Sequence, residues 1–121
     1  MDSFGHVNNT LYLRWAESAR IDYFIRARLW SPAEPLVIGP ILAHLSCNYR
    51  IPVEYPDTVH VGTRVSHMGN SSFRMTHVIV SAAHHAVAAD LDSTLVFYDY
   101  GRSKPTRLPD EIRSVINALE S

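Results

Sequence analysis

The residues best suited to chemistry lie in the first nine positions, which read MDSFGHVNN. Asp2 supplies a carboxylate, and the segment runs directly into a long helical pattern that begins at Asn9. Amide groups at a helix start lack partners within the helix and carry a partial positive charge, so they can polarise a carbonyl and stabilise an oxyanion. A nearby carboxylate can act as nucleophile or as base for water. The spacing fits attack on a carbonyl carbon, and it equally fits a helix merely capped by Asp2, Asn8 and Asn9.

Several common enzyme signatures are absent from the sequence. It contains no G-x-S-x-G nucleophile elbow, no cysteine pair and no H-E-x-x-H pattern. The seven histidines, at positions 6, 44, 60, 67, 77, 84 and 85, lack the spacing of metal ligands. We therefore expect neither a metal site nor an α/β-hydrolase triad.

Length and composition indicate one globular domain over residues 1–121, with 46% hydrophobic and 19% charged residues. The formal net charge of −1, from 11 basic and 12 acidic residues, gives no sign of nucleic-acid binding. No apolar run approaches the roughly 18 residues of a membrane helix. The lone Cys47 cannot form an internal disulfide, and the first residues do not resemble a secretory signal. We expect a cytoplasmic protein that acts without membrane or nucleic acid.

A long helix is predicted over residues 9–30, which contain no glycine or proline. Its polar residues recur every four positions in one stripe, formed by Arg14, Ser18, Asp22 and Arg26. Most of the remaining circumference is apolar, so the helix should be covered on several sides. Glu17 and Arg20 have the spacing of a surface ion pair. Ser31-Pro32 should end the helix, because the residue before a proline is disfavoured in helical geometry.

After this helix the apolar period changes to two, which predicts strands. Four are expected, over residues 41–51, 58–68, 72–81 and 86–98. The fourth should place Val87, Ala89, Leu91, Leu95 and Phe97 on one face. Short connections between the later strands predict antiparallel pairing. A basic loop over 101–109 and a short amphipathic helix, with Pro109 in its first turn, should follow. The predicted fold is α+β, an antiparallel sheet wrapped around one long helix.

The sequence resembles the 4-hydroxybenzoyl-CoA thioesterase-like branch of the hotdog superfamily. Three matches are looser, namely Tyr49-Arg50-x-Pro52 with Asp57, the turn at 69–73, and Leu108-Pro109-Asp110. The most specific match is Asp2-x-x-Gly5-His6-Val7-Asn8-Asn9-x-x-Tyr12-x-x-Trp15-x-Glu17-x-Ala19-Arg20.

This resemblance implies a hydrolase that cleaves acyl-CoA thioesters without metal or organic cofactor, assembled as a homodimer or homotetramer. Asp2 would be the catalytic carboxylate, the amide of Asn9 would polarise the thioester carbonyl, and Gly5 would allow close approach. His6 is assigned either a substrate contact or a structural hydrogen bond. Tyr12 suits the core or the adjacent acyl pocket. The other candidate substrate contacts are Asn8, Arg50, Ser71 and Ser72.

The chain departs from the family pattern before Asp2, where members carry a strand that ends in a further acidic residue. The first strand is therefore expected to be missing or shortened. Three alternatives to the acyl-CoA thioesterase share the fold. They are a thioesterase for acyl groups on acyl carrier protein, a non-catalytic acyl-CoA-binding module, and a dehydratase that would use His6 as its catalytic histidine.

Overall fold

The structure is a computed structural model that describes residues 9–29 and 38–121. Its helices and strands follow in the order α1 (Asn9–Arg26), β1 (Ile38–Tyr49), β2 (Val59–Met68), β3 (Ser72–Ser81), β4 (Ala86–Asp99), β5 (Lys104–Pro105) and α2 (Asp110–Glu120). The candidate residues Asp2, Gly5, His6 and Asn8 lie outside the described residues.

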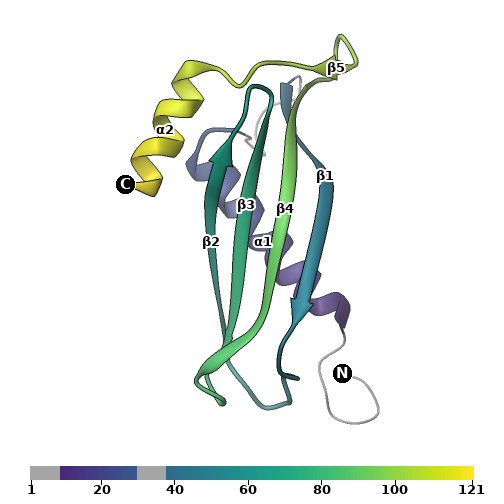
Figure 1. The fold of residues 1–121 in the computed structure, drawn as a ribbon, viewed down its shortest axis with the longest axis vertical. Coiled ribbons are helices and arrows are strands. Elements are labelled where there is room, and N and C mark those ends of the chain that lie inside the picture. The colour runs from purple at the N-terminus through teal and green to yellow at the C-terminus, as the bar shows by residue number, and fades with distance from the viewer. Residues whose placement is uncertain (1–8, 30–37) are drawn as a thin grey trace.

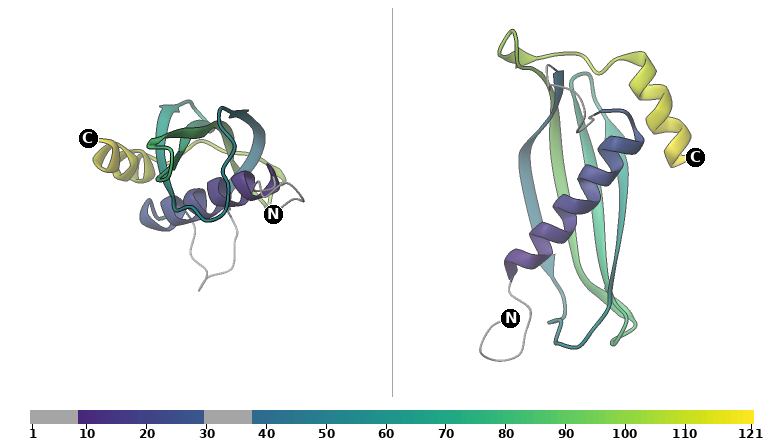
Figure 2. Two further views of the ribbon diagram at one scale, coloured as in Figure 1. Left: turned by 90° about the horizontal axis from the view of Figure 1, so that it is seen from below. Right: turned by 180° about the vertical axis from the view of Figure 1, so that it is seen from behind.

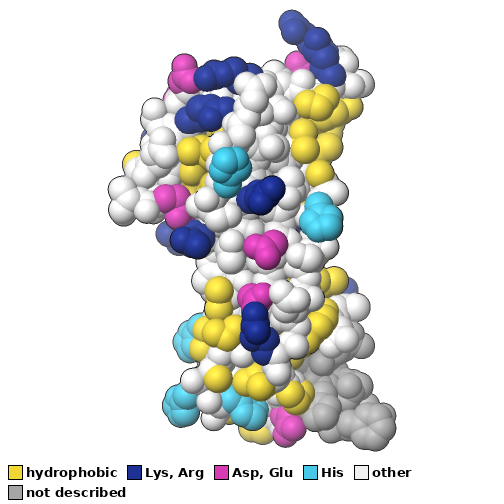
Figure 3. All heavy atoms as spheres, viewed as in Figure 1, with side chains coloured by type: hydrophobic (Ala, Val, Ile, Leu, Met, Phe, Trp, Pro, Cys, Tyr) yellow, Lys and Arg dark blue, Asp and Glu magenta, His cyan; other side chains and the backbone are white. Residues whose placement is uncertain are grey.

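The strands form one antiparallel sheet in the order β1-β4-β3-β2, and the short β5 pairs with the end of β4. The sheet curves, and α1 crosses its concave side on a diagonal (Figures 1 and 2). The outer face of the sheet carries acidic, basic and histidine side chains (Figure 3). This is the predicted α+β arrangement of a sheet around one long helix.

The predicted strands are all present, and the third has the predicted bounds, Ser72–Ser81. On β4 the prediction for Val87 is wrong, because its side chain is 37% exposed while Ala88 and Ala89 are both buried. The cause is a shift in the pairing of β3 with β4. Ile79 pairs with Ala89 but Val80 pairs with Val87, so Ala88 is an extra residue that interrupts the alternation. The basic loop also contains β5, which the sequence pattern did not indicate.

Helix α1 ends earlier than predicted, at Arg26, because its chain closes in a left-handed turn. Arg28 has a φ of 61°, and the N–H of Leu29 donates to the carbonyl of Phe24 at 2.8 Å. The N–H of Arg28 donates to the carbonyl of Ile25 at 3.2 Å. These two bonds define a Schellman motif, which satisfies the last carbonyls of a helix. The residue in the left-handed position is usually glycine, so the arginine hides this stop signal in the sequence.

Helix α2 packs beside β2 and is tied to the β2–β3 turn by Arg113. The guanidinium of Arg113 donates to the carbonyls of Gly69 at 2.6 Å and Leu108 at 2.9 Å. Ile116 is buried against the sheet, as the amphipathic pattern predicted. Pro109 precedes the first turn as the N-cap residue and does not lie within it.

The core is divided into two apolar clusters along the length of α1. The cluster near the helix start comprises Tyr12, Ala16, Val53, Ile79, Ala88, Ala89 and Leu91. The cluster beyond the middle comprises Tyr23, Ala27, Leu29, Val65, Phe73, Met75, Leu95, Phe97, Leu108 and Ile116. Each helix or strand that contributes to both clusters carries a polar residue at the boundary between the two clusters.

Candidate active site

The start of α1 is fixed by contacts with the end of β1 and the loop that follows it. The N–H of Val53 donates to the Tyr12 hydroxyl at 3.1 Å, and Tyr12 is only 2% exposed. The Tyr12 ring meets the rings of Trp15 and Tyr49 edge-on, with centroids 5.3 and 5.2 Å apart. Tyr12 is therefore a core residue that holds this end of the helix in place.

Asn9 is the first residue of α1, as predicted, and its side chain is exposed. Its N–H is one of the first four amide groups of α1, which have no hydrogen-bond acceptor within the helix. The Tyr49 hydroxyl lies 3.5 Å from the Asn9 carbonyl oxygen. A carbonyl group presented to this helix start from outside would meet the N–H donor of Asn9 and the positive end of the helix dipole.

Two carboxylates at the same end of the molecule as the start of α1 already have structural partners. Asp57 accepts hydrogen bonds from the Ser81 hydroxyl and from the N–H groups of Thr58 and Ala83. These bonds, that of Ser81 first, lower the pKa of Asp57. Asp57 thus joins the loop before β2 to the β3–β4 turn, and its oxygens are occupied.

Asp90 is the second of these carboxylates. It accepts a hydrogen bond from Asn48 at 3.0 Å and forms an ion pair with Arg50. The bond from Asn48 and that from Arg50 lower the pKa of Asp90. Asn48 and Arg50 alternate with Tyr49 along the chain, so they lie on the outer face while Tyr49 faces the helix. Arg50 is therefore near the helix start, but it points away from the helix and is paired.

Ser71 and Ser72 lie far from the helix start within one subunit. Ser72 is paired with Val96 of β4, whereas Tyr49 is paired with Ala89. The offset of seven residues from Ala89 to Val96 corresponds to about 23 Å along the strand. The β2–β3 turn is thus at the opposite end of the sheet from the start of α1 (Figure 1). A single subunit does not bring these serines together with Asn9.

A polar layer, defined as Arg20, Thr63, His77 and Ser93, separates the two apolar clusters; Thr63 is half-buried and the other three are buried. The His77 ring is bonded on one side to the Thr63 hydroxyl and on the other to the Ser93 hydroxyl, both at 3.0 Å. Burial, and then the positive charge of Arg20, lower the pKa of His77 to about 4. His77 is therefore neutral near pH 7.

Arg20 is the charged member of the layer, and its prediction as half of a surface ion pair is wrong. Its side chain is 5% exposed, and one guanidinium nitrogen, Nη1, is buried without a hydrogen-bond partner. Burial lowers the pKa of Arg20, while the exposed Glu17 acts in the opposite direction. The helical spacing of Arg20 from Ala16 and Tyr23 on the apolar face was the signal in the sequence.

A groove of about 660 Å³ runs between α1, β2 and the end of α2. Its wall from the helix includes Trp15 and Tyr23, and its wall from β2 consists of Val59, Val61 and Thr63. The groove begins more than a turn beyond the helix start, so it is separate from the position of Asn9. The sequence did not predict it.

Within residues 9–29 and 38–121, no three histidine, cysteine, aspartate or glutamate side chains are grouped as a metal would require. Neither of the two described helices is long and apolar enough to cross a membrane.

Comparison with solved structures supports the architecture. A thioesterase from Thermus thermophilus, complexed with coenzyme A and Zn, is 36% identical with a TM-score of 0.83, and the match covers 99% of this chain and 85% of that one. The PA2801 protein from Pseudomonas aeruginosa is 32% identical with a TM-score of 0.83, and the match covers 96% of this chain and 88% of that one.

The sequence comparisons agree with this likeness. The long-chain acyl-CoA thioesterase FadM of Escherichia coli K12 is 25% identical over 119 residues, which are 98% of this chain and 90% of that protein. The family model described as the thioesterase-like superfamily matches residues 1–116, a span that includes the Asp2–Asn9 segment as well as the sheet and helix described above. The predicted family and its hotdog fold are therefore confirmed, and the chain belongs to the thioesterase-like superfamily.

Proposed function

We propose that the protein hydrolyses acyl-CoA thioesters to a free acid and CoA at the start of α1. The observation that carries the proposal is the family match over residues 1–116, which includes Asp2 and the helix start in one continuous span. Two similar proteins support the substrate class. FadM is a long-chain acyl-CoA thioesterase, and the Thermus thermophilus thioesterase was solved with coenzyme A.

The helix start supplies the electrophilic half of the reaction. The thioester carbonyl oxygen accepts a hydrogen bond from the Asn9 N–H, and the dipole of α1 stabilises the negative charge that develops on this oxygen. Tyr12 and Val53 tie the first turn to the loop after β1, so the donor keeps its position during the reaction. Preorganised donors of this kind need no rearrangement when the charge forms.

Asp2 supplies the other half, by one of two routes. As a nucleophile, its carboxylate attacks the thioester carbon and expels the CoA thiolate, and water then cleaves the resulting acyl anhydride. As a general base, it takes a proton from water while the oxygen of that water attacks the carbon, and the thiolate leaves and is protonated. Both routes pass through an oxyanion at the Asn9 amide. Gly5 and His6 belong to the same segment, where Gly5 allows close approach and His6 contacts the substrate or orders the loop.

The proposed assembly is a homodimer or homotetramer. Among the described residues β1 is an edge strand, and it exposes Ile38, Leu42 and Tyr49, which are between 42% and 46% accessible. An apolar edge strand favours association with another chain. Arg50 lies near the helix start with its side chain on the outer face, where it pairs with Asp90, so a CoA contact would have to be made on that face. Asn8 suits a CoA contact by its place in the sequence. Ser71 and Ser72 would have to reach that CoA from the second subunit. A cytoplasmic location fits the free thiol of Cys47.

The test is Asp2→Asn, assayed with a panel of short, long and aromatic acyl-CoA thioesters by detection of the released thiol. We expect kcat to fall about a hundredfold or more, because a positioned base or nucleophile is lost. Asp22→Asn is the matched control, since Asp22 is an exposed carboxylate further along α1. Near wild-type turnover in Asp2→Asn would remove this carboxylate from the mechanism. Turnover of acyl carrier protein thioesters alone would indicate the alternative substrate, and no turnover of either would leave only a binding module.

A further inference from the structure

The last residue of β1, Tyr49, directs its side chain at the start of α1. Its hydroxyl lies 3.5 Å from the carbonyl oxygen of Asn9, and its ring meets the ring of Tyr12 edge-on, with centroids 5.2 Å apart. The end of β1 and the start of α1 lie side by side in both views of the fold (Figures 1 and 2). The reaction proposed at the helix start does not yet use this hydroxyl.

The backbone that carries Tyr49 is anchored on β4. Tyr49 itself pairs with Ala89. The next two N–H groups, those of Arg50 and Ile51, both donate to the carbonyl of Ala88, at 2.8 and 3.2 Å. Ala88 is the extra residue of the bulge in β4. Bulges end regular pairing and redirect side chains, and they are common beside active sites. The bulge thus holds the end of β1 at the point from which Tyr49 reaches the helix.

The first turn of α1 meets Tyr49 at two points. One is the Asn9 carbonyl and the other is the ring of Tyr12, three residues later on the same side of the helix. Tyr12 is 2% exposed, and its hydroxyl accepts a hydrogen bond from the N–H of Val53 at 3.1 Å. The second contact is therefore with a residue that is itself fixed. Tyr49 can transmit this rigidity to Asn9, the first residue of the helix.

The Tyr49 hydroxyl is chemically suited to hold the Asn9 carbonyl. Partial burial, and then a hydrogen bond with the Cys47 thiol, raise the pKa of Tyr49, so the hydroxyl keeps its proton. It has one proton to donate and two lone pairs that accept. A carbonyl oxygen is a good acceptor, whereas a thiol is weak both as donor and as acceptor. The hydroxyl can therefore donate to Asn9 while it accepts from Cys47.

We propose that Tyr49 is a positioning residue of the thioesterase site, whose hydroxyl holds the Asn9 carbonyl while the Asn9 N–H binds the oxyanion. This inference rests on the proposed function. The N–H and C=O of Asn9 flank one Cα atom, so a hydrogen bond to the carbonyl restricts rotations that would turn the N–H away from the substrate. Such a restraint matters at this residue because helix ends fray. The distance of 3.5 Å is long for a hydrogen bond, and it shortens when the thioester binds, as active-site bonds commonly do.

The first test is Tyr49→Phe, which keeps the ring and its contact with Tyr12 but removes the hydroxyl. We expect kcat for acyl-CoA hydrolysis to fall about three- to tenfold, the range for one neutral hydrogen bond. KM should change less than about twofold, because the lost bond acts on the oxyanion donor and not on bound substrate. Tyr100→Phe is the matched control, since it removes a hydroxyl from an exposed tyrosine directly after β4 and should leave both constants unchanged. Circular dichroism checks that both fold.

A second variant separates the two neighbours of the hydroxyl. Cys47→Ala removes the thiol and leaves the Asn9 contact in place, so it should lower kcat less than Tyr49→Phe does. An equal loss would mean that the hydroxyl acts by holding the strand through Cys47, which would overturn the proposal.

A double variant shows whether Tyr49 acts through Asn9. Asn9→Pro has no N–H for the hydroxyl to position, so adding Tyr49→Phe to it should cause no further loss of kcat. Independent of turnover, the NMR resonance of the Asn9 carbonyl carbon reports the hydrogen bond directly. It should move upfield in Tyr49→Phe, with and without bound CoA, and stay in place in Tyr100→Phe.

The outcomes separate this inference from the proposed function. An active wild type with full kcat in Tyr49→Phe, or an unshifted Asn9 carbonyl, would overturn the role of Tyr49 and leave the thioesterase intact. A change in KM alone would make Tyr49 a substrate contact, and additive losses in the double variant would place its action away from Asn9. Either result would overturn the proposal. A wild type that cleaves no thioester would overturn the proposed function and this inference together.

Discussion

The two halves of α1 do different work, although one continuous helix forms both. Its first turn presents backbone amides, and the candidate chemistry comes from residues adjacent in sequence. Its second half faces a polar layer and a groove that are assembled from β2, β3, β4 and α2. The first half can be recognised from a motif, and the second only from tertiary contacts.

This difference has a physical basis. The backbone N–H groups of a helix start can bind an anion by themselves, so a short sequence motif is enough to predict such a site. The polar layer depends on which strand faces which part of the helix. His77 meets Thr63 and Ser93 only because β2 and β4 flank β3 in this register. The comparison predicts that changes at the first turn affect turnover, while changes in the second half affect stability.

The largest effect is expected at Asn9. Asn9→Pro deletes the N–H but is tolerated in a helix first turn, so kcat should fall about a hundred- to a thousandfold while the helix remains. Asn9→Ala keeps the N–H and should lose mainly the cap, roughly 1 kcal/mol if the side chain provides one. Turnover and circular dichroism of both variants are the measurements. A folded proline variant as active as the alanine variant would mean that another group polarises the carbonyl.

The second effect concerns acid stability and the His77 ring. Its pKa is about 4 in the folded protein and about 6.5 when unfolded, so protonation favours unfolding. The stability from neutral His77 is complete above about pH 6.5 and decreases as the pH falls, by about 3 kcal/mol at pH 4. Urea unfolding from pH 7.5 to 4 should show this slope in the wild type and a flatter one in His77→Gln.

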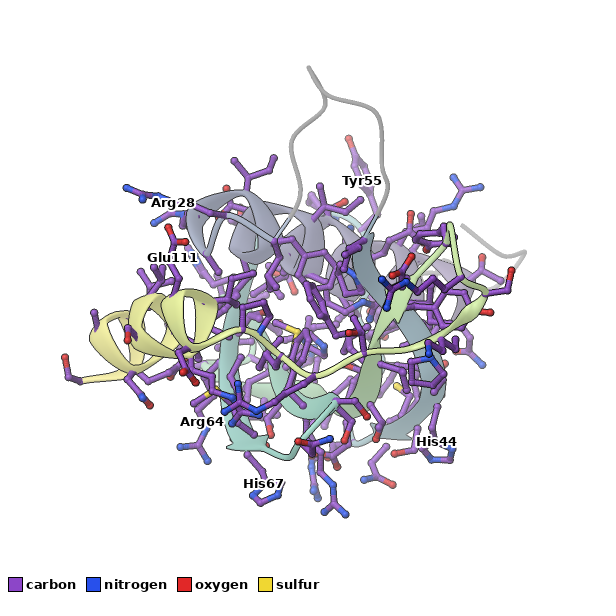
Figure 4. The ribbon with its side chains drawn as sticks, turned by 90° about the horizontal axis from the view of Figure 1, so that it is seen from above. Arg28, His44, Tyr55, Arg64, His67 and Glu111 are labelled. Carbon is purple, nitrogen blue, oxygen red and sulfur yellow. The ribbon has the colours of Figure 1, made fainter. Side chains whose placement is uncertain are left out.

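The charges that act on His77 are those of Arg20 and Asp92, which lower and raise its pKa respectively. The matched control is His67→Gln, because His67 is exposed on the outer face (Figure 4). This variant should keep the wild-type slope. If both variants show the same pH dependence as the wild type, His77 is not what makes the fold acid-sensitive.

A smaller effect is expected from Arg20, whose Nη1 is buried without a partner. Arg20→Met retains apolar bulk and removes this unmatched group, so stability at pH 7 should stay equal or rise by about 1–2 kcal/mol. The pKa of His77 should rise in this variant, because a neighbouring positive charge is gone. NMR titration of the His77 ring measures that rise. A loss of more than about 1 kcal/mol would show that the other guanidinium nitrogens hold stabilising bonds.

The sequence predicted the elements well where one local rule dominates. The alternation of apolar and polar residues predicted both ends of β3. The segment without glycine or proline predicted the start of α1 and most of its length. The helix end was missed because Arg28 adopts a conformation usually taken by glycine. Val87 was misplaced because a bulge is set by pairing between strands. The first-turn site stays a prediction from the motif, whereas the groove became visible only from the way α1, β2 and α2 line it together.

The smallest predicted effect concerns Glu120 and distinguishes its role as a hydrogen-bond acceptor from the effect of its negative charge. Glu120→Ala removes the acceptor of Val65 N–H and of the Tyr23 hydroxyl, so stability should fall by about 1–2 kcal/mol. Glu120→Gln retains a carbonyl oxygen that can accept both bonds, and it should cost less than about half of that. Burial, and then Glu120, raise the pKa of Tyr23, so both variants should lower that pKa in a phenol absorbance titration. Glu111→Ala, an exposed change at the other end of α2, is the control and should alter stability by only a few tenths of a kcal/mol. Equal losses in the alanine and glutamine variants would mean that the charge of Glu120, and not its capacity to accept hydrogen bonds, stabilises the fold.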